Sequence, residues 1–283
     1  MKRFLIKTLI LLVLATAIFG SAAFFGYMMF IMPKEELRDD QAAGMTASPP
    51  PDTTIPEFEK CMALVNQHKV IESRAALENF IANYPASTRL EAAKDALGRV
   101  NVDIFLSAIA APEKEAYTIQ KGDALAKIEK KLKVSGGMIM RSNNIDNPRM
   151  LRVGDVLYVS HPQFSLVVSR KEHEVTLYNH AKFFKQYRAT TWNVPPSKTN
   201  APITAKVTDV AAFVNSQRVA PGTREFVEAP VHWIQFSASS YTLYTDPHEN
   251  GTAEVPAAGI ALSGSEMDEL SALLTRGVPV TIE

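Results

Sequence analysis

The sequence has few of the residues from which disulfide frameworks, metal sites and nucleophilic centres are built. Its only cysteine, Cys61, has no partner for an intramolecular disulfide, and a zinc site made of several cysteines is excluded. The six histidines lack the HxH or HExxH spacing that is typical of metal ligands, and no GxGxxG or Walker-type glycine loop occurs. We therefore expect no metal, no cofactor and no bound nucleotide.

An excess of charge of either sign is also missing, because 30 basic residues balance 30 acidic ones. A chain without a global field has no general preference for nucleic acid, so we expect no nucleic-acid partner. A local basic cluster is interrupted by Glu129, which favours a solvated helix face over a phosphate-binding patch. This cluster consists of Lys127, Lys130, Lys131 and Lys133.

One long uncharged apolar run is present, at residues 8–32. It is long enough to cross a hydrocarbon core of about 30 Å as a helix. Three basic residues precede it and a mainly acidic segment follows, which favours a cytoplasmic N-terminus. We expect residues 1–33 to be a single-pass anchor in the inner (cytoplasmic) membrane, with the bulk of the chain periplasmic. The alternative is a cleaved signal peptide with its cleavage site at residues 20–23, although cleavage there would leave residues 24–32 as an exposed apolar tail.

Residues 34–56 are polar and rich in proline, as expected of a linker. Residues 57–111 show apolar positions at three-to-four spacing and predict three short helices, with a capping box at residues 88–91. The stretch ALENFIANYPAS resembles a tetratricopeptide hairpin, but too few helical pairs follow to build a peptide groove. We expect a helical spacer in which Cys61 is a buried core thiol.

Residues 116–160 predict a small module of strand, helix, helix and strand. The extended YTI leads into a Gly-Asp turn, after which Leu125, Ile128 and Leu132 form a helical stripe with Asp123 placed to cap it. A second apolar group surrounds Asn143 and Asn144, and LRVGDVLYV alternates as a closing strand.

These spaced elements together resemble the lysin motif, LysM. The resemblance implies recognition of N-acetylglucosamine chains in peptidoglycan, in a shallow groove between two loops. Gly and Pro loops expose backbone groups for the acetamido group, and Leu and Met supply an apolar wall. Ala124 departs from the family, which usually has a hydroxyl residue there. The alternative is a LysM fold retained as a spacer. By position, the groove consists of Gly122, Asp123, Ala124, Leu125, Asn147, Pro148, Arg149, Met150 and Leu151.

From residue 164 to 283 the pattern changes to β-structure. Three alternating runs are separated by turns at residues 170–172 and 179–180, which predicts an antiparallel meander. With KTNAPITAKVTD, HWIQFSASSYTLYTDP and the ending GSEMDELSALLTRGVPVTI, this region resembles the catalytic domain of L,D-transpeptidases, which cross-link peptidoglycan through a cysteine thioester. Near its end, Ser263 and Glu266 predict a capping box, and Gly277 predicts the helix stop.

The resemblance also shows which catalytic groups are missing. The cysteine position of the family falls on Gly259, the arginine position on Ala261 and the upstream histidine position on Tyr244. Thioester chemistry needs an activated thiolate, and Cys61 lies far away in the helical block. Serine chemistry at Ser263 or Ser265 is not expected, because a serine that caps a helix already has a structural role and no GxSxG or SxxK motif occurs. Of the candidate bases, His232 is expected to be a packed side chain and His248 a turn residue.

The sequence thus predicts an α+β, multidomain chain with a transmembrane helix, a helical block, a βααβ LysM module and a β-rich, inactive L,D-transpeptidase-like domain. Peptidoglycan glycan strands are the expected partner, with the membrane and cell-wall proteins as further partners. The alternative is an active cell-wall-remodelling enzyme that uses non-standard residues. If the C-terminal domain is degenerate, Tyr244 and Gly259 should lie side by side in a cleft without a nucleophile.

Overall fold

The computed structural model describes residues 52–196, 201–220, 222–250 and 255–283, and Thr53–Glu283 form one compact unit. The predicted fold class is wrong in one respect. The structure is mixed α/β with a β-rich C-terminal part, but none of the helices in these ranges is long and apolar enough to cross a membrane. The predicted anchor at residues 1–33 lies outside the described residues, and so does the linker before residue 52. The prediction of an anchor rested only on the length and hydropathy of the apolar run. These two properties show that a segment is compatible with a bilayer, but they do not determine its structure.

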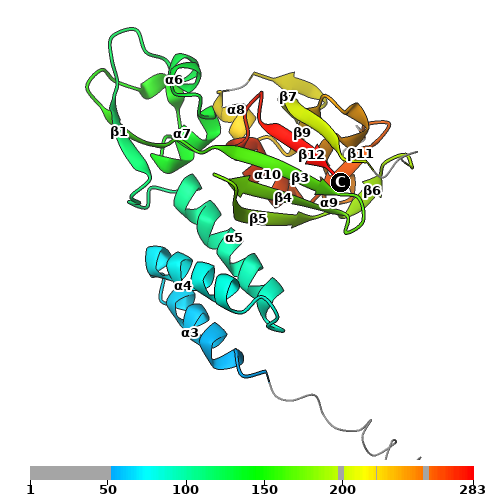
Figure 1. Cartoon of the computed structure of the whole chain (residues 1–283). Helices are drawn as coiled ribbons and strands as arrows, with labels where there is room; N and C mark the ends of the chain where they lie inside the picture. Colours follow the sequence, from blue (N-terminus) through cyan, green and yellow to red (C-terminus); the bar gives the residue numbers. More distant parts are fainter. Residues whose placement is uncertain (1–51, 197–200, 221, 251–254) are drawn as a thin grey trace, which may run out of the picture. The chain divides into compact units, whose positions relative to one another are not determined.

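Three helices open the described part of the chain (Figure 1): α3 (Ile55–Asn66), α4 (Val70–Asn83) and α5 (Leu90–Leu106). Helices α3 and α4 pack through Phe58 and Phe80, whose ring centroids lie 5.7 Å apart. Cys61 is buried as expected. The predicted capping box at residues 88–91 is wrong, because Arg89 occupies the N-cap of α5 without a side-chain cap and Glu91 is therefore one position too early.

A βααβ module follows, made of β1 (Lys114–Thr118), α6 (Leu125–Leu132), α7 (Gly136–Ser142), the 3-10 turn η1 (Pro148–Met150) and β2 (Val156–Ser160). Strands β1 and β2 pair antiparallel, with Thr118 opposite Val156, so the predicted order of elements is confirmed. The predicted cap is wrong: Ala124 is the N-cap of α6, and no side chain caps that helix. The Asp123 carboxylate instead accepts hydrogen bonds from the Gln120 backbone N–H and the Tyr117 hydroxyl, closing the turn before the helix.

The C-terminal part is built on a ten-stranded sheet with the order β5-β4-β3-β12-β7-β9-β10-β11-β6, in which β8 pairs with β7. Strands β3, β4 and β5 form the predicted antiparallel meander. Burial alternates along β3, as expected for a strand with one face in the core. The strands are β3 (Phe164–Ser169), β4 (Glu174–Asn179), β5 (Lys182–Arg188), β6 (Thr191–Asn193), β7 (Ile203–Val214), β8 (Gln217–Val219), β9 (Val231–Phe236), β10 (Leu243–Thr245), β11 (Gly259–Leu262) and β12 (Pro279–Ile282).

The helical elements of this part are α8 (Arg224–Val227), η2 (Ser239–Tyr241), α9 (Pro247–Asn250) and α10 (Gly264–Leu273). Helix α10 begins with the predicted capping box between Ser263 and Glu266, which is confirmed. The helix ends at Leu273, so Gly277 does not stop it. Gly277 lies instead in the turn before β12, where its φ of 93° suits glycine.

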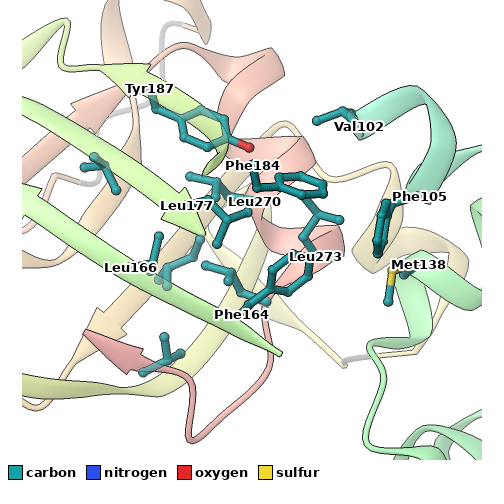
Figure 2. Packing of buried hydrophobic residues seen from close by; sticks show 14 of the residues in the cluster. Val102, Phe105, Met138, Phe164, Leu166, Leu177, Phe184, Tyr187, Leu270 and Leu273 are labelled. Carbon is teal, nitrogen blue, oxygen red and sulfur yellow. The ribbon is translucent and has the colours of Figure 1, made fainter. Parts of the chain in front are cut away.

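One hydrophobic core joins these element groups (Figure 2). Phe105 of α5, Phe164 of β3 and Phe184 of β5 pack edge to face or tilted, with ring centroids 5.1 to 6.0 Å apart. Met138 of α7 and Leu273 of α10 belong to the same cluster. The helical block, the βααβ module and the sheet therefore stabilise one another.

Candidate functional site

The first candidate site is the loop region of the βααβ module. The loop after β1 and the loop before β2 are joined by backbone hydrogen bonds from Ile119 N–H to the Asp155 carbonyl, 2.9 Å, and from Gly154 N–H to the Ile119 carbonyl, 2.9 Å. Lys127 donates to the Gly122 carbonyl at 2.8 Å. The pKa of Asp123 is lowered mainly by the hydrogen bond from the Tyr117 hydroxyl and, to a smaller extent, by the one from the Gln120 N–H. The carboxylate is therefore ionised at neutral pH.

The predicted groove residues belong to two loops of the module, residues 122–125 after β1 and residues 147–151 before β2. Gly122 and Ala124 are exposed, Asp123 is half-buried and Leu125 is buried at the start of α6. No hydrogen bond within the described residues joins them to the second half. In that half, Asn147 caps η1 by accepting from Arg149 N–H, Pro148 and Leu151 are half-buried, and Arg149 and Met150 are exposed.

An open hollow of about 680 Å³ lies beside the second half of the groove. Asn147, Met150 and Leu151 line it together with the end of α7 and strand β2, and none of residues 122–125 does. Its wall includes Val156 and Tyr158, whose side chains are exposed on the outer face of β2. Sequence reasoning missed these two residues, although the alternation along VLYV places Val156 and Tyr158 on the face opposite the buried Leu157 and Val159.

Asn143 has a structural role beside this hollow. Its side-chain Nδ2 donates to the Ile139 carbonyl at 2.8 Å and to the Tyr158 carbonyl at 3.0 Å, and its Oδ1 accepts from Tyr158 N–H at 2.6 Å. These bonds fix the end of α7 to β2 and hold the Tyr158 backbone in place. The exposed ring of Tyr158 therefore extends from a backbone that is hydrogen-bonded to the end of α7.

The second candidate region contains Tyr244, Gly259 and Ala261, the positions that the resemblance aligns with catalytic groups. Tyr244 of β10 pairs with Ala261 of the parallel strand β11, and Gly259 starts that strand. A Cβ atom on Gly259 would lie 3.2 Å from the Tyr244 ring and only 2.4 Å from the Thr242 carbonyl oxygen. Tyr244 and Gly259 are therefore side by side, as predicted. The prediction that they lie in an open cleft is wrong, because Gly259 and Ala261 are buried and Tyr244 is only 2% exposed.

The remaining candidates for catalysis have structural partners. His232 is 1% exposed, and its Nε2 lies 3.1 Å from the Phe226 carbonyl, so it is the packed side chain that was predicted. Burial lowers its pKa, which keeps the imidazole neutral. Ser263 is occupied in the capping box. His248 lies in the short helix α9, not in a turn, because Asp246 accepts from its backbone N–H and starts that helix. Burial raises the pKa of the Cys61 thiol, which disfavours a thiolate.

Residues 117–160 match the LysM domain family. The matched range covers nearly the whole βααβ module, from the end of β1 to the end of β2. LysM domains bind peptidoglycan glycan, so this match supports association of the chain with the cell wall. None of the curated proteins matches this chain.

Part of the chain is also similar to solved L,D-transpeptidases. The similarity to an L,D-transpeptidase from Mycobacterium smegmatis has 13% identity and a TM-score of 0.30, and it covers 47% of this chain and 64% of that one. For the L,D-transpeptidase from Stackebrandtia nassauensis the identity is 15% and the TM-score 0.29, with 43% and 55% covered. The chain thus matches less than two thirds of the length of either enzyme.

Proposed function

We infer that this chain is a peptidoglycan-binding protein that recognises N-acetylglucosamine-containing glycan through its LysM module and acts outside the cytoplasm, where that polymer lies. The observation that carries this proposal is the LysM match at residues 117–160 on a complete βααβ module.

The chemistry of the hollow beside η1 suits this ligand. A sugar ring has an apolar face, and an exposed aromatic ring such as Tyr158 offers a matching surface. The acetamido group needs a donor, an acceptor and an apolar wall for its methyl group. Around the hollow, the Asn147 side chain and the exposed loop backbone are polar, whereas Met150 and Val156 are apolar.

Binding can be tested with the full chain and purified peptidoglycan in a sedimentation assay. Deletion of the module would disturb the shared core, so point variants are the better test. We expect Tyr158→Ala and Val156→Ala to reduce retention on the polymer, because both side chains are exposed and wall the hollow. Val255→Ala is the matched control, since Val255 is 44% exposed and Val156 48%, and Val255 lies elsewhere. Unchanged retention of both module variants would contradict the assignment of the hollow, and failure of the unaltered chain to sediment would contradict glycan binding itself.

We further infer that the C-terminal part performs no cross-linking chemistry and acts as a scaffold or a binding module for cell-wall partners. Three observations support this proposal. Gly259, which the resemblance aligns with the nucleophile, packs against Thr242 and Tyr244. His232 is buried and bonded to the Phe226 carbonyl, and the only thiol of the sequence is buried in α3.

The test is mass spectrometry of the full chain after incubation with a β-lactam and, separately, with a thiol-reactive probe. We expect no adduct on any residue between 164 and 283. A Cys61→Ser variant is the control, since an adduct that survives this substitution would establish a nucleophile elsewhere and favour the alternative of an active enzyme.

A further inference from the structure

A second cavity lies between the βααβ module and the C-terminal part, away from the hollow beside η1. Its volume is about 720 Å³. One wall comes from α6 and the start of α7, and the other from β7, the segment around β8 and the end of α10. The two walls are held together by the Ser135 hydroxyl, which donates to the Ala272 carbonyl, and by the ion pair of Arg141 with Asp268.

The charged side chains of this cavity do not balance. Four cationic groups line it, Lys130 and Lys133 on the module side and Arg218 and Arg276 on the opposite side, against two carboxyl groups. Asp209 binds both arginines, at 2.7 Å from Arg218 and 2.8 Å from Arg276. One carboxylate thus serves two guanidinium groups, which leaves an unneutralised positive charge on that wall.

The two lysines add to this excess. Neither Lys130 nor Lys133 forms an ion pair with any described residue. The second carboxyl group, on Glu129, is half-buried next to them, and burial raises its pKa, although the Gly136 N–H partly offsets that effect. Even when it is ionised, this single carboxyl group balances only one of the two lysines.

Between the charged groups the wall is apolar. Phe226 and Leu274 are almost fully buried with an edge in the cavity, and Val210 of β7 is half-buried there. Concave sites that combine apolar walls with a few converging charges are typical of small-molecule binding.

We propose that this cavity binds a small ligand in which an oxyanion, a carboxylate or a phosphate, is attached to an apolar body. The oxyanion lies between the lysines of α6 and the two arginines around Asp209, and the apolar body contacts Phe226, Val210 and Leu274. Because the ligand contacts both walls, it binds only the assembled arrangement and stabilises it by mass action. This site does not depend on glycan binding by the LysM module.

The test is isothermal titration calorimetry of the full chain with three probes: N-acetyl-phenylalanine, its neutral amide and phenyl phosphate. We expect heat of binding with at least one of the two anions, and affinity for the amide at least about tenfold lower, since the amide lacks the charge that the four cations attract. The ratio of the two anion affinities identifies the oxyanion source. Equal affinity for N-acetyl-phenylalanine and its amide, or no binding of either anion, would overturn the proposal.

The location is tested with the double variant Lys130→Gln/Lys133→Asn, in which asparagine tolerates the left-handed backbone at position 133. Both lysines are exposed, so the variant should fold, which a melting curve checks. We expect anion affinity to fall about tenfold, an effect that salt should reproduce by screening. Lys131→Gln is the matched control, because Lys131 lies on the same helix but contacts Tyr117 outside the cavity. Equal losses in the double variant and the control would place the anion elsewhere, and peptidoglycan retention should stay unchanged in both.

Discussion

The packing around Gly259 gives a quantitative prediction for the variant Gly259→Cys, which places a thiol at the start of β11. In this structure a side chain there meets the Thr242 carbonyl oxygen at 2.4 Å and the Tyr244 ring at 3.2 Å. Unstrained contacts between carbon and carbonyl oxygen begin at about 3.3 Å. The two strands would therefore have to separate by about 1 Å.

The energetic cost follows from this geometry. Overpacking of a well-packed core costs about 1–3 kcal/mol, and the upper end applies here because the obstacle is backbone and not a flexible side chain. For a unit of this size, about 3 kcal/mol corresponds to a decrease in melting temperature of about 6–12 °C. We also expect the introduced thiol to be unreactive in the folded protein, since the position is buried.

The measurement is a pair of thermal melts with thiol labelling under native conditions, in a Cys61→Ala background. Ala257→Cys is the matched control, because Ala257 is exposed two residues upstream and its thiol should react without loss of stability. A Gly259→Cys variant that melts with its parent, or that labels as fast as the control, would refute the packing argument and reopen the case for chemistry at this position.

Three further predictions concern other parts of the fold. Asn143→Ala should destabilise the protein by about 2 kcal/mol, because it removes the side-chain hydrogen bonds between the end of α7 and β2. Urea titration measures this change, and an unchanged midpoint would show that these hydrogen bonds contribute no stability. Ala124→Ser should stabilise by about 1 kcal/mol, because the N-cap of α6 has extended backbone and no capping side chain; a melting temperature at or below that of the parent would contradict this. The lowered pKa of His232, caused by burial, means that the unfolded chain takes up a proton that the folded chain resists, so stability should fall as pH drops from about 6.5 through the folded pKa. His232→Gln, whose amide can still donate to the Phe226 carbonyl, should flatten that slope in melts across this range, and equal slopes would assign the dependence to other groups.

The sequence by itself determined the local elements of this protein. The alternating runs in residues 164–188 predicted the meander, and the spaced elements of residues 116–160 predicted strand, helix, helix and strand. The Ser263–Glu266 box marked the start of α10 correctly. These features depend on neighbouring residues, so local periodicity and capping chemistry suffice to find them. The same reasoning was wrong where a side chain has competing local partners. Asp123 was predicted to cap α6, but its carboxylate accepts a hydrogen bond from the Tyr117 hydroxyl and not from a backbone N–H of that helix.

Only the tertiary structure decided which distant residues meet. The core that joins Phe105, Phe164 and Phe184 and the packing of Gly259 against Thr242 depend on contacts between distant segments. So does the cavity that Lys130 lines together with Asp209 and the two arginines bound to it. Sequence patterning reports which face of an element is apolar, but it does not report which other element covers that face. The lysine cluster therefore looked like a solvated helix face in the sequence, and two of its members line a cavity in the fold.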